Sequence, residues 1–168
     1  KADQAQRLID LTKQAGGKIY GAEFFNEPNI PGHGSLPQGY SADNYIRDFR
    51  IFQAWVKKSA PGMKIFGPGS AAEGSMMKDA GGKRPGFLSS DDLMRGNPNS
   101  VDIMTYHYYG GVSQRCAGPN SPTVSQADAL SAAWLDRTLI DYEHYAALRN
   151  KYEPGKPMWL NETAQAAC

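Results

Sequence analysis

The chain has 168 residues, enough for one domain with a hydrophobic core of its own. Its 18 lysines and arginines stand against 17 aspartates and glutamates, for a formal net charge of +1. No basic excess is present to hold a phosphate backbone, which argues against a nucleic acid partner. No apolar run approaches the roughly 18 residues that a membrane span needs. Aromatic residues make up 11% of the chain, a content that favours a packed core over disorder.

The predicted elements alternate between helix and strand along the whole chain. In chain order they are a helix at 3–15, a strand at 18–25, a loop at 26–40, a helix at 42–59, a strand at 63–66, a loop at 70–88, a short helix at 89–96, a strand at 101–106, a loop to about 122, a long helix at 125–151 and a strand at 158–161. Ser41 is a good N-cap for the second helix, and the glycine pair at 16–17 ends the first. Repeated strand and helix units predict an α/β fold with a parallel sheet. Periodicity alone does not separate a barrel from an open doubly wound sheet.

Two of these strands end in a glutamate with distinctive neighbours. Glu27 stands in an Asn-Glu-Pro sequence, and Pro28 stops the strand at once, whereas Glu162 follows Trp-Leu-Asn. In parallel α/β folds, functional groups gather at the carboxyl ends of the strands. Glycoside hydrolysis needs one carboxylic acid and one carboxylate, about 5–5.5 Å apart for retention or about 6.5–9.5 Å apart for inversion. Most glutamates are ordinary loop residues, and Glu23 is expected to face a crossover helix or to pair with a lysine.

These settings resemble the catalytic strands of clan A glycoside hydrolases, and most closely those of glycoside hydrolase family 79, the heparanase and β-glucuronidase family. Four stretches carry the resemblance in the same order: Phe25-Asn26-Glu27-Pro28-Asn29, Lys64-Ile65-Phe66-Gly67-Pro68, Tyr106-His107-Tyr108-Tyr109 and Pro157-Met158-Trp159-Leu160-Asn161-Glu162-Thr163. The resemblance spans nearly the whole chain. It implies that residues 1–168 are a partial catalytic (β/α)8 TIM barrel domain, truncated at both ends, which supplies about strands four to seven.

The resemblance also implies roles for individual side chains. Glu27 would be the general acid/base and Glu162 the nucleophile, so Glu27 must be protonated near neutral pH while Glu162 stays ionised. Asn26 would bond the sugar 2-hydroxyl, an interaction that tightens in the transition state. Tyr108 would hydrogen-bond the nucleophile, and His107 would line the substrate cleft.

The activity implied is retaining hydrolysis of β-linked glucuronides through a glycosyl-enzyme intermediate on Glu162. This chemistry needs two carboxylates and water, so neither a cofactor nor a metal is expected. The expected partners are a carbohydrate substrate and the remainder of the barrel, in the same or another chain. Two alternatives stay open: a clan A glycosidase for another sugar, such as a xyloside, glucoside or arabinofuranoside, and a non-catalytic carbohydrate-binding barrel remnant.

Cys116 and Cys168 have no zinc-site spacing. They are either free thiols, or thiols with partners outside this sequence, or one disulfide between two loops. A disulfide would indicate an oxidising compartment, and the expected location is extracellular or a secretory or lysosomal-type compartment.

Four further aromatic and histidine side chains are expected to have structural or surface positions. Tyr106 and Tyr109 are expected to pack in the fold rather than to bind substrate. His33 and His144 are expected at the surface, and with His107 they show no spacing typical of a metal site.

Overall fold

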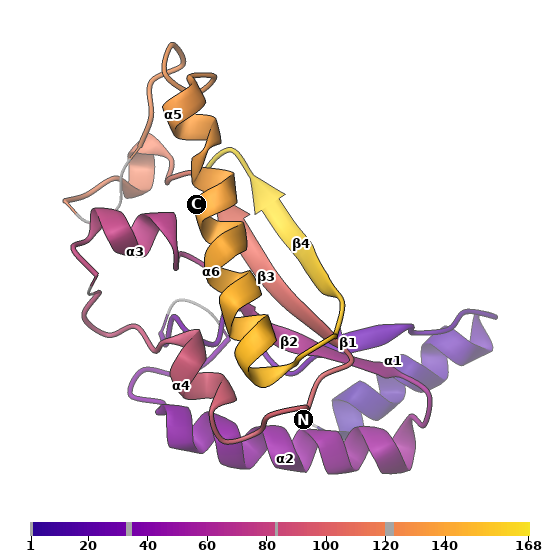
Figure 1. Ribbon diagram of the computed structural model, residues 1–168. Helices are drawn as coiled ribbons and strands as arrows, with labels where there is room; N and C mark the ends of the chain where they lie inside the picture. Colours follow the sequence, from indigo (N-terminus) through magenta and orange to yellow (C-terminus); the bar gives the residue numbers. More distant parts are fainter. Residues whose placement is uncertain (1, 33–34, 83, 120–122) are drawn as a thin grey trace.

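The structure is a computed structural model, and it describes residues 2–32, 35–82, 84–119 and 123–168 (Figure 1). Four parallel strands form one sheet in the order β1-β2-β3-β4. The strands are β1 Gly21–Glu23, β2 Lys64–Ser70, β3 Ile103–Tyr109 and β4 Met158–Ala164. The helices are α1 Ala2–Gln14, α2 Ala42–Ser59, α3 Ser75–Asp79, α4 Ser90–Met94, α5 Ala132–Leu135 and α6 Arg137–Tyr152, with a 3-10 turn η1 at Gln114–Cys116. The predicted parallel α/β fold is confirmed.

The hydrophobic core lies between one face of this sheet and helices α2, α4 and α6 (Figure 1). Its buried members include Tyr45, Phe49, Leu93, Met94, Met104, Tyr106, Tyr145 and Leu148. The rings of Tyr106 and Tyr145 stack with 4.7 Å between their centroids, so the expectation that Tyr106 packs is confirmed. Side chains alternate along a strand, so this leaves Thr105, His107 and Tyr109 of β3 for the opposite face.

Helix α2 has the boundaries that the sequence predicts, and the side chain of Ser41 accepts a hydrogen bond from the Asn44 amide at 3.2 Å. The predicted helix at 125–151 is wrong in its first third, where turns precede the short α5 and then α6. The hydroxyls of Ser125 and Ser131 accept from the amides of Asp128 and Trp134. The Ser125 bond holds a local turn in place of a helix, and Ser131 is the N-cap at which α5 begins.

The strands also differ in length from the prediction. β1 has only three residues, whereas β2 runs four residues beyond Phe66, to Ser70. The ladder between β2 and β3 continues through Pro68, paired with Thr105, and shifts register before Ser70. Part of the predicted loop at 70–88 is helical as α3. Among the described residues, no helix combines the length and the apolar character needed to cross a membrane.

Candidate active site

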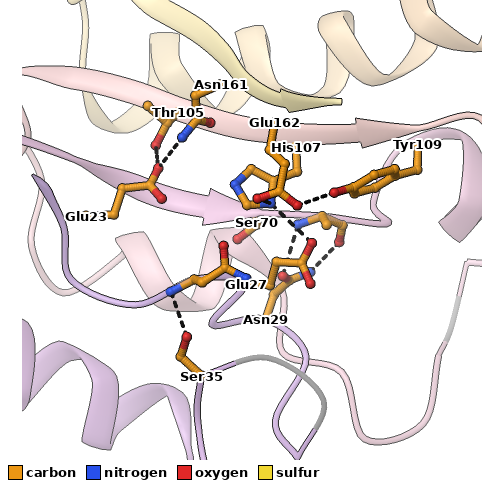
Figure 2. Close-up of polar contacts among 12 residues, drawn as sticks. Glu23, Glu27, Asn29, Ser35, Ser70, Thr105, His107, Tyr109, Asn161 and Glu162 are labelled. Atoms are coloured by element: carbon orange, nitrogen blue, oxygen red, sulfur yellow. Dashed lines mark hydrogen bonds and ion pairs between the residues drawn. The ribbon is translucent and has the colours of Figure 1, made fainter. Parts of the chain in front are cut away.

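Glu27 and Glu162 meet around a single histidine at the carboxyl ends of the strands (Figure 2). The Nδ1 atom of His107 lies 3.1 Å from Oε1 of Glu27 and 3.7 Å from Oε2 of Glu162. The His107 side chain is only 1% exposed, so it lies buried beneath both carboxylates. Two glutamates that lie far apart in the sequence therefore lie at one rim of the sheet, because parallel strands all end at the same edge.

Glu27 is placed by the backbone of its loop. Its φ of 47° lies in the left-handed region, which costs a non-glycine residue about 1–3 kcal/mol and persists only where the surroundings fix it. The Glu27 amide donates to the carbonyl of Gly69 at 3.2 Å. Two residues on, the side chain of Asn29 donates to the carbonyl of Ala71 at 2.6 Å and accepts from its amide at 3.1 Å. These bonds fasten the Glu27 loop to the end of β2.

Asn29 supports the loop of the candidate site, and the sequence did not single it out. It is fully buried, and its amide group satisfies both backbone groups of Ala71 (Figure 2). A signal was available, since Asn29 belongs to the Asn-Glu-Pro-Asn stretch at the strand end. Burial of a polar amide beside a catalytic candidate indicates a structural hydrogen-bonding role.

Glu162 is placed by side chains from the neighbouring strand. The hydroxyl of Tyr109 donates a short hydrogen bond to Oε1 of Glu162 (Figure 2). Burial raises the pKa of Tyr109 well above its usual range, and the hydrogen bond to Glu162 together with the charges of Glu162 and Glu27 raises it further. Tyr109 therefore remains a hydrogen-bond donor at any physiological pH. The Glu162 side chain is 44% exposed, against 19% for Glu27.

The prediction that Tyr108 hydrogen-bonds Glu162 is wrong. Tyr109 makes this hydrogen bond, whereas Tyr108 packs against the core on the helix side of the sheet. The reason is the alternation of a strand: His107 and Tyr109 share a face, and the residue between them must point away. The expectation that Tyr109 packs rather than binds substrate stays a prediction.

Asn26 lies at the same rim, but its side chain is exposed. Its backbone is fixed by Ser35, whose hydroxyl accepts from the Asn26 amide at 3.0 Å and whose amide donates to the Asn26 carbonyl at 3.0 Å. The contact of Asn26 with a sugar 2-hydroxyl stays a prediction, as does the lining of the cleft by His107.

Glu23 is a second correction. Its side chain does not face the helices, because the next residue, Phe24, occupies the helix side and packs on the rings of α2. The Glu23 carboxylate instead accepts hydrogen bonds from Thr105 and Asn161 on the opposite face (Figure 2). A residue of β1 thus reaches one of β4, which requires the sheet to curve toward this face.

The two cysteines form a disulfide, which confirms one of the alternatives left open by the sequence. The bond joins the loop after β3 to the segment after β4. An isolated parallel bridge between Val112 and Ala167 adds a backbone connection beside it. The loops that follow Tyr109 and Glu162 are therefore tied to each other.

His144 lies partly exposed on α6, with Nε2 3.7 Å from a carboxylate oxygen of Glu73. The Glu73 carboxylate at this distance raises the pKa of His144, assisted by the charges of Asp141 and Asp91 and opposed by burial. His33 lies outside the described residues. Its surface position stays a prediction.

Glu27, His107 and Glu162 each offer one ligand-type atom, and these atoms all lie within 4.8 Å of one another. Within the described part of the chain, this is the one group of at least three such residues close enough to hold a metal ion. The same arrangement suits acid–base chemistry on a sugar, for which two carboxylates are sufficient.

No family model matches the sequence, and no curated protein matches it either. Solved structures do match. A monomeric β-xylosidase from Caulobacter crescentus CB15 has a TM-score of 0.60 at 17% identity, over 99% of this chain and 31% of that one. A family 44 endoglucanase from Clostridium thermocellum has a TM-score of 0.59 at 17% identity, over 99% of this chain and 40% of that one. A bacterial orthologue of human α-L-iduronidase has a TM-score of 0.53 at 18% identity, over 99% and 26%.

The chain spans less than half the length of each of these structures. At such low identities the likeness establishes the fold. The four parallel strands and their helices are half of a (β/α)8 barrel, which confirms the predicted fold class.

Proposed function

We propose that this chain carries the catalytic residues of a retaining glycoside hydrolase that cleaves β-linked glucuronides. The observation that carries the proposal is the meeting of Glu27 and Glu162 over the buried His107, at the carboxyl ends of the first and last strands. Relatives in fold named as a β-xylosidase, an endoglucanase and an iduronidase support the same class of chemistry.

The distances favour the retaining mechanism. A carboxylate oxygen of Glu27 lies within 4.8 Å of one of Glu162, near the separation of about 5–5.5 Å typical of retaining enzymes and below that of inverting ones. Glu27 donates its proton to the leaving oxygen while Glu162 attacks the anomeric carbon, which forms a glycosyl ester. Glu27 then removes a proton from water, which displaces Glu162 and releases a sugar of unchanged anomeric configuration.

The surroundings of the two carboxylates suit these unequal roles. The partly exposed Glu162 receives a hydrogen bond from Tyr109, which holds the carboxylate of the proposed nucleophile in place. The less exposed Glu27 faces His107, so the proton it exchanges has a neighbouring ring nitrogen at 3.1 Å.

The choice of sugar rests on the resemblance to family 79. One of the relatives in fold is named as an orthologue of an iduronidase, a name that refers to a uronic acid. A second candidate is a xyloside, because a β-xylosidase shares this fold over 99% of the chain. We expect the groups that distinguish these sugars to come in part from the remainder of the barrel, in the same or another chain.

The disulfide between Cys116 and Cys168 supports an extracellular or secretory or lysosomal-type location for the protein. Such a location also suits an enzyme with a glycan or glycoside as its substrate.

The test is hydrolysis of an aryl β-D-glucuronide by the full-length protein that contains this chain, beside its Glu162→Ala variant. We expect turnover by the wild type and none by the variant. Added azide should restore the variant's activity and give an azide product of inverted configuration, because azide replaces the missing nucleophile. Activity on an aryl xyloside alone would favour the second candidate. A Glu162→Ala variant as active as the wild type would overturn the assignment of the nucleophile.

A further inference from the structure

Three polar side chains from three strands meet near the two catalytic candidates. They lie on the face of the sheet opposite the core helices, which is called the inner face below. The Glu23 carboxylate of β1 accepts from the hydroxyl of Thr105 on β3 and, at 2.9 Å, from the side-chain amide of Asn161 on β4 (Figure 2). Both bonds end on the same carboxylate oxygen, and Thr105 is fully buried. These contacts involve none of the residues to which the proposed mechanism assigns a step.

The path of Glu23 across the sheet depends on a glycine. A Cβ atom built on Gly69 of β2 would lie 2.8 Å from the carboxyl carbon and both carboxylate oxygens of Glu23. Adjacent strands are about 4.8 Å apart, so β1 and β4 are three spacings from each other along the sheet. Only the curvature of the sheet and the missing side chain at Gly69 allow Glu23 to reach Asn161.

Asn161 is also the residue at which β4 loses its regular alternation. Leu160 pairs with Tyr106 and Glu162 pairs with His107, which leaves Asn161 as an extra residue in β4. Bulges of this kind redirect side chains beside active sites. Here the bulge allows Asn161 and Glu162, although consecutive, both to contact residues of the inner face.

From these contacts we propose that Glu23 is a positioning residue for the nucleophile. It anchors the bulged Asn161 and thereby fixes the direction in which the next residue, Glu162, points. The inference rests on the proposed function, since it assigns Glu162 the role of nucleophile. The proposed mechanism assigns Glu23 no step of its own, so its effect on Glu162 passes through the bond to Asn161.

The geometry explains why such an anchor matters. Glu162 is 44% exposed, and its own contacts are to Tyr109 and His107 of the one neighbouring strand. Those contacts fix the end of its side chain, whereas the Asn161 bond to Glu23 fixes the backbone from across the sheet. Attack on an anomeric carbon tolerates little error, and a displacement of about 1 Å costs about a hundredfold in rate.

The first experiment removes the anchor at its exposed end. In the full-length protein, Asn161→Ala should lower kcat for aryl glycosides about tenfold to a hundredfold and leave KM within about twofold. The loss should be the same for good and poor leaving groups, because nucleophile placement rather than proton donation is affected. Glu143→Gln, a change at an exposed glutamate of α6, is the control and should leave kcat unchanged.

The second experiment reverses the hydrogen bond. Asn161→Asp alone places two carboxylates against each other and should lower kcat at least as much as Asn161→Ala. Adding Glu23→Gln to Asn161→Asp lets the new amide donate to the new carboxylate, and should recover most of the lost activity. Glu23→Gln alone should cost less than about fivefold, because its amide oxygen still accepts. A merely structural role would not give this recovery.

The results separate the two proposals. A wild-type protein inactive on every aryl glycoside would overturn the proposed function and, with it, this inference. An active wild type whose Asn161→Ala variant retains full kcat would overturn the inference alone, as would failure of Glu23→Gln to recover a folded Asn161→Asp variant. If Asn161→Asp does not fold, the leaving-group series of Asn161→Ala decides the matter by itself.

Discussion

Glu27 and Glu162 have the same type of side chain, but the loop of Glu27 and the strand end of Glu162 position it in different ways. Glu27 follows β1 in a left-handed backbone conformation, with its amide bonded to Gly69 and its loop fixed by the buried Asn29. Glu162 lies within β4 at a bulge, and side-chain bonds place it, from Tyr109 directly and through its neighbour Asn161.

The difference predicts whether a substitution near each glutamate will lower the stability of the fold or the rate of catalysis. Around Glu27, the support comes from buried hydrogen bonds between the Asn29 side chain and backbone atoms, so its loss should appear as lost stability. Around Glu162, the supporting groups are side chains at a partly exposed edge, so their loss should appear mainly as lost catalysis. Each of the following variants tests one side of this comparison.

The largest effect is expected at Glu27 itself. Glu27→Gln removes the proton that the leaving oxygen needs, so kcat/KM for poor leaving groups should fall about a thousandfold, within the range of general acid catalysis. Activated aryl glycosides leave without that proton and should lose far less. The measurement is kcat/KM across a series of aryl glycosides of graded leaving-group acidity. An equal loss throughout the series would argue against an acid role for Glu27.

The next effect concerns the support of the Glu27 loop. Asn29→Ala leaves the buried amide and carbonyl of Ala71 without partners, and each unsatisfied group costs about 1–3 kcal/mol. We expect the free energy of unfolding to fall by about 3 kcal/mol, measured by urea denaturation of the full-length protein. Asn150→Ala on the exposed surface of α6 is the matched control, expected within about 0.5 kcal/mol of wild type.

A smaller effect is expected on the Glu162 side. Tyr109→Phe removes a hydrogen bond to a carboxylate worth about 2 kcal/mol, so kcat should fall about thirtyfold while the unfolding curve barely moves. Tyr108→Phe changes the neighbouring residue in the same way and should leave kcat within about twofold. Equal losses in the two variants would show that strand alternation does not decide which tyrosine serves Glu162.

The smallest effect is a pH dependence away from both carboxylates. The nearby Glu73 carboxylate raises the pKa of His144 in the folded state. The contact therefore stabilises the fold fully below the unfolded pKa of about 6.5 and loses its contribution as pH rises through the folded value. Because His144 is 38% exposed, we expect less than about 1 kcal/mol.

The measurement is the difference in unfolding free energy between the wild type and His144→Gln from about pH 5.5 to 8.5. The difference should shrink as pH rises. The charges that face His144 are those of Glu73, Asp141 and Asp91, and all three must be kept in both proteins. A difference independent of pH would mean that this histidine does not titrate in the range.

Much of the architecture was predictable because it depends on local patterns. Ser41 at the start of α2 and the apolar spacing that follows it predict a helix of the right length. Alternating helix and strand predict parallel strands, and parallel strands place Glu27 and Glu162 at one rim. The helix predicted at 125–151 begins later because the Ser125 hydroxyl accepts from the Asp128 amide in a local turn and α5 starts only at its N-cap, Ser131. Periodicity does not register these hydrogen bonds.

The sequence predicted that Glu27 and Glu162 would lie close together, but not which residues support them. The choice between Tyr108 and Tyr109 depends on the face that each presents, which alternation from His107 would have settled. The roles of Glu23 and Asn29 depend on partners more than 40 residues away along the chain. Of the two, only Asn29 has a local signal, which is its place in the Asn-Glu-Pro-Asn stretch.

By itself, the sequence determined the parallel α/β fold and the two glutamates at strand ends, because propensity, capping and strand spacing act over a few residues. It also left the pairing of Cys116 and Cys168 open. The tertiary structure alone decided that pairing, the bulge at Asn161 and the reach of Glu23 past Gly69. These features depend on the curvature and register of the sheet, which arise only when all four strands have packed against their helices.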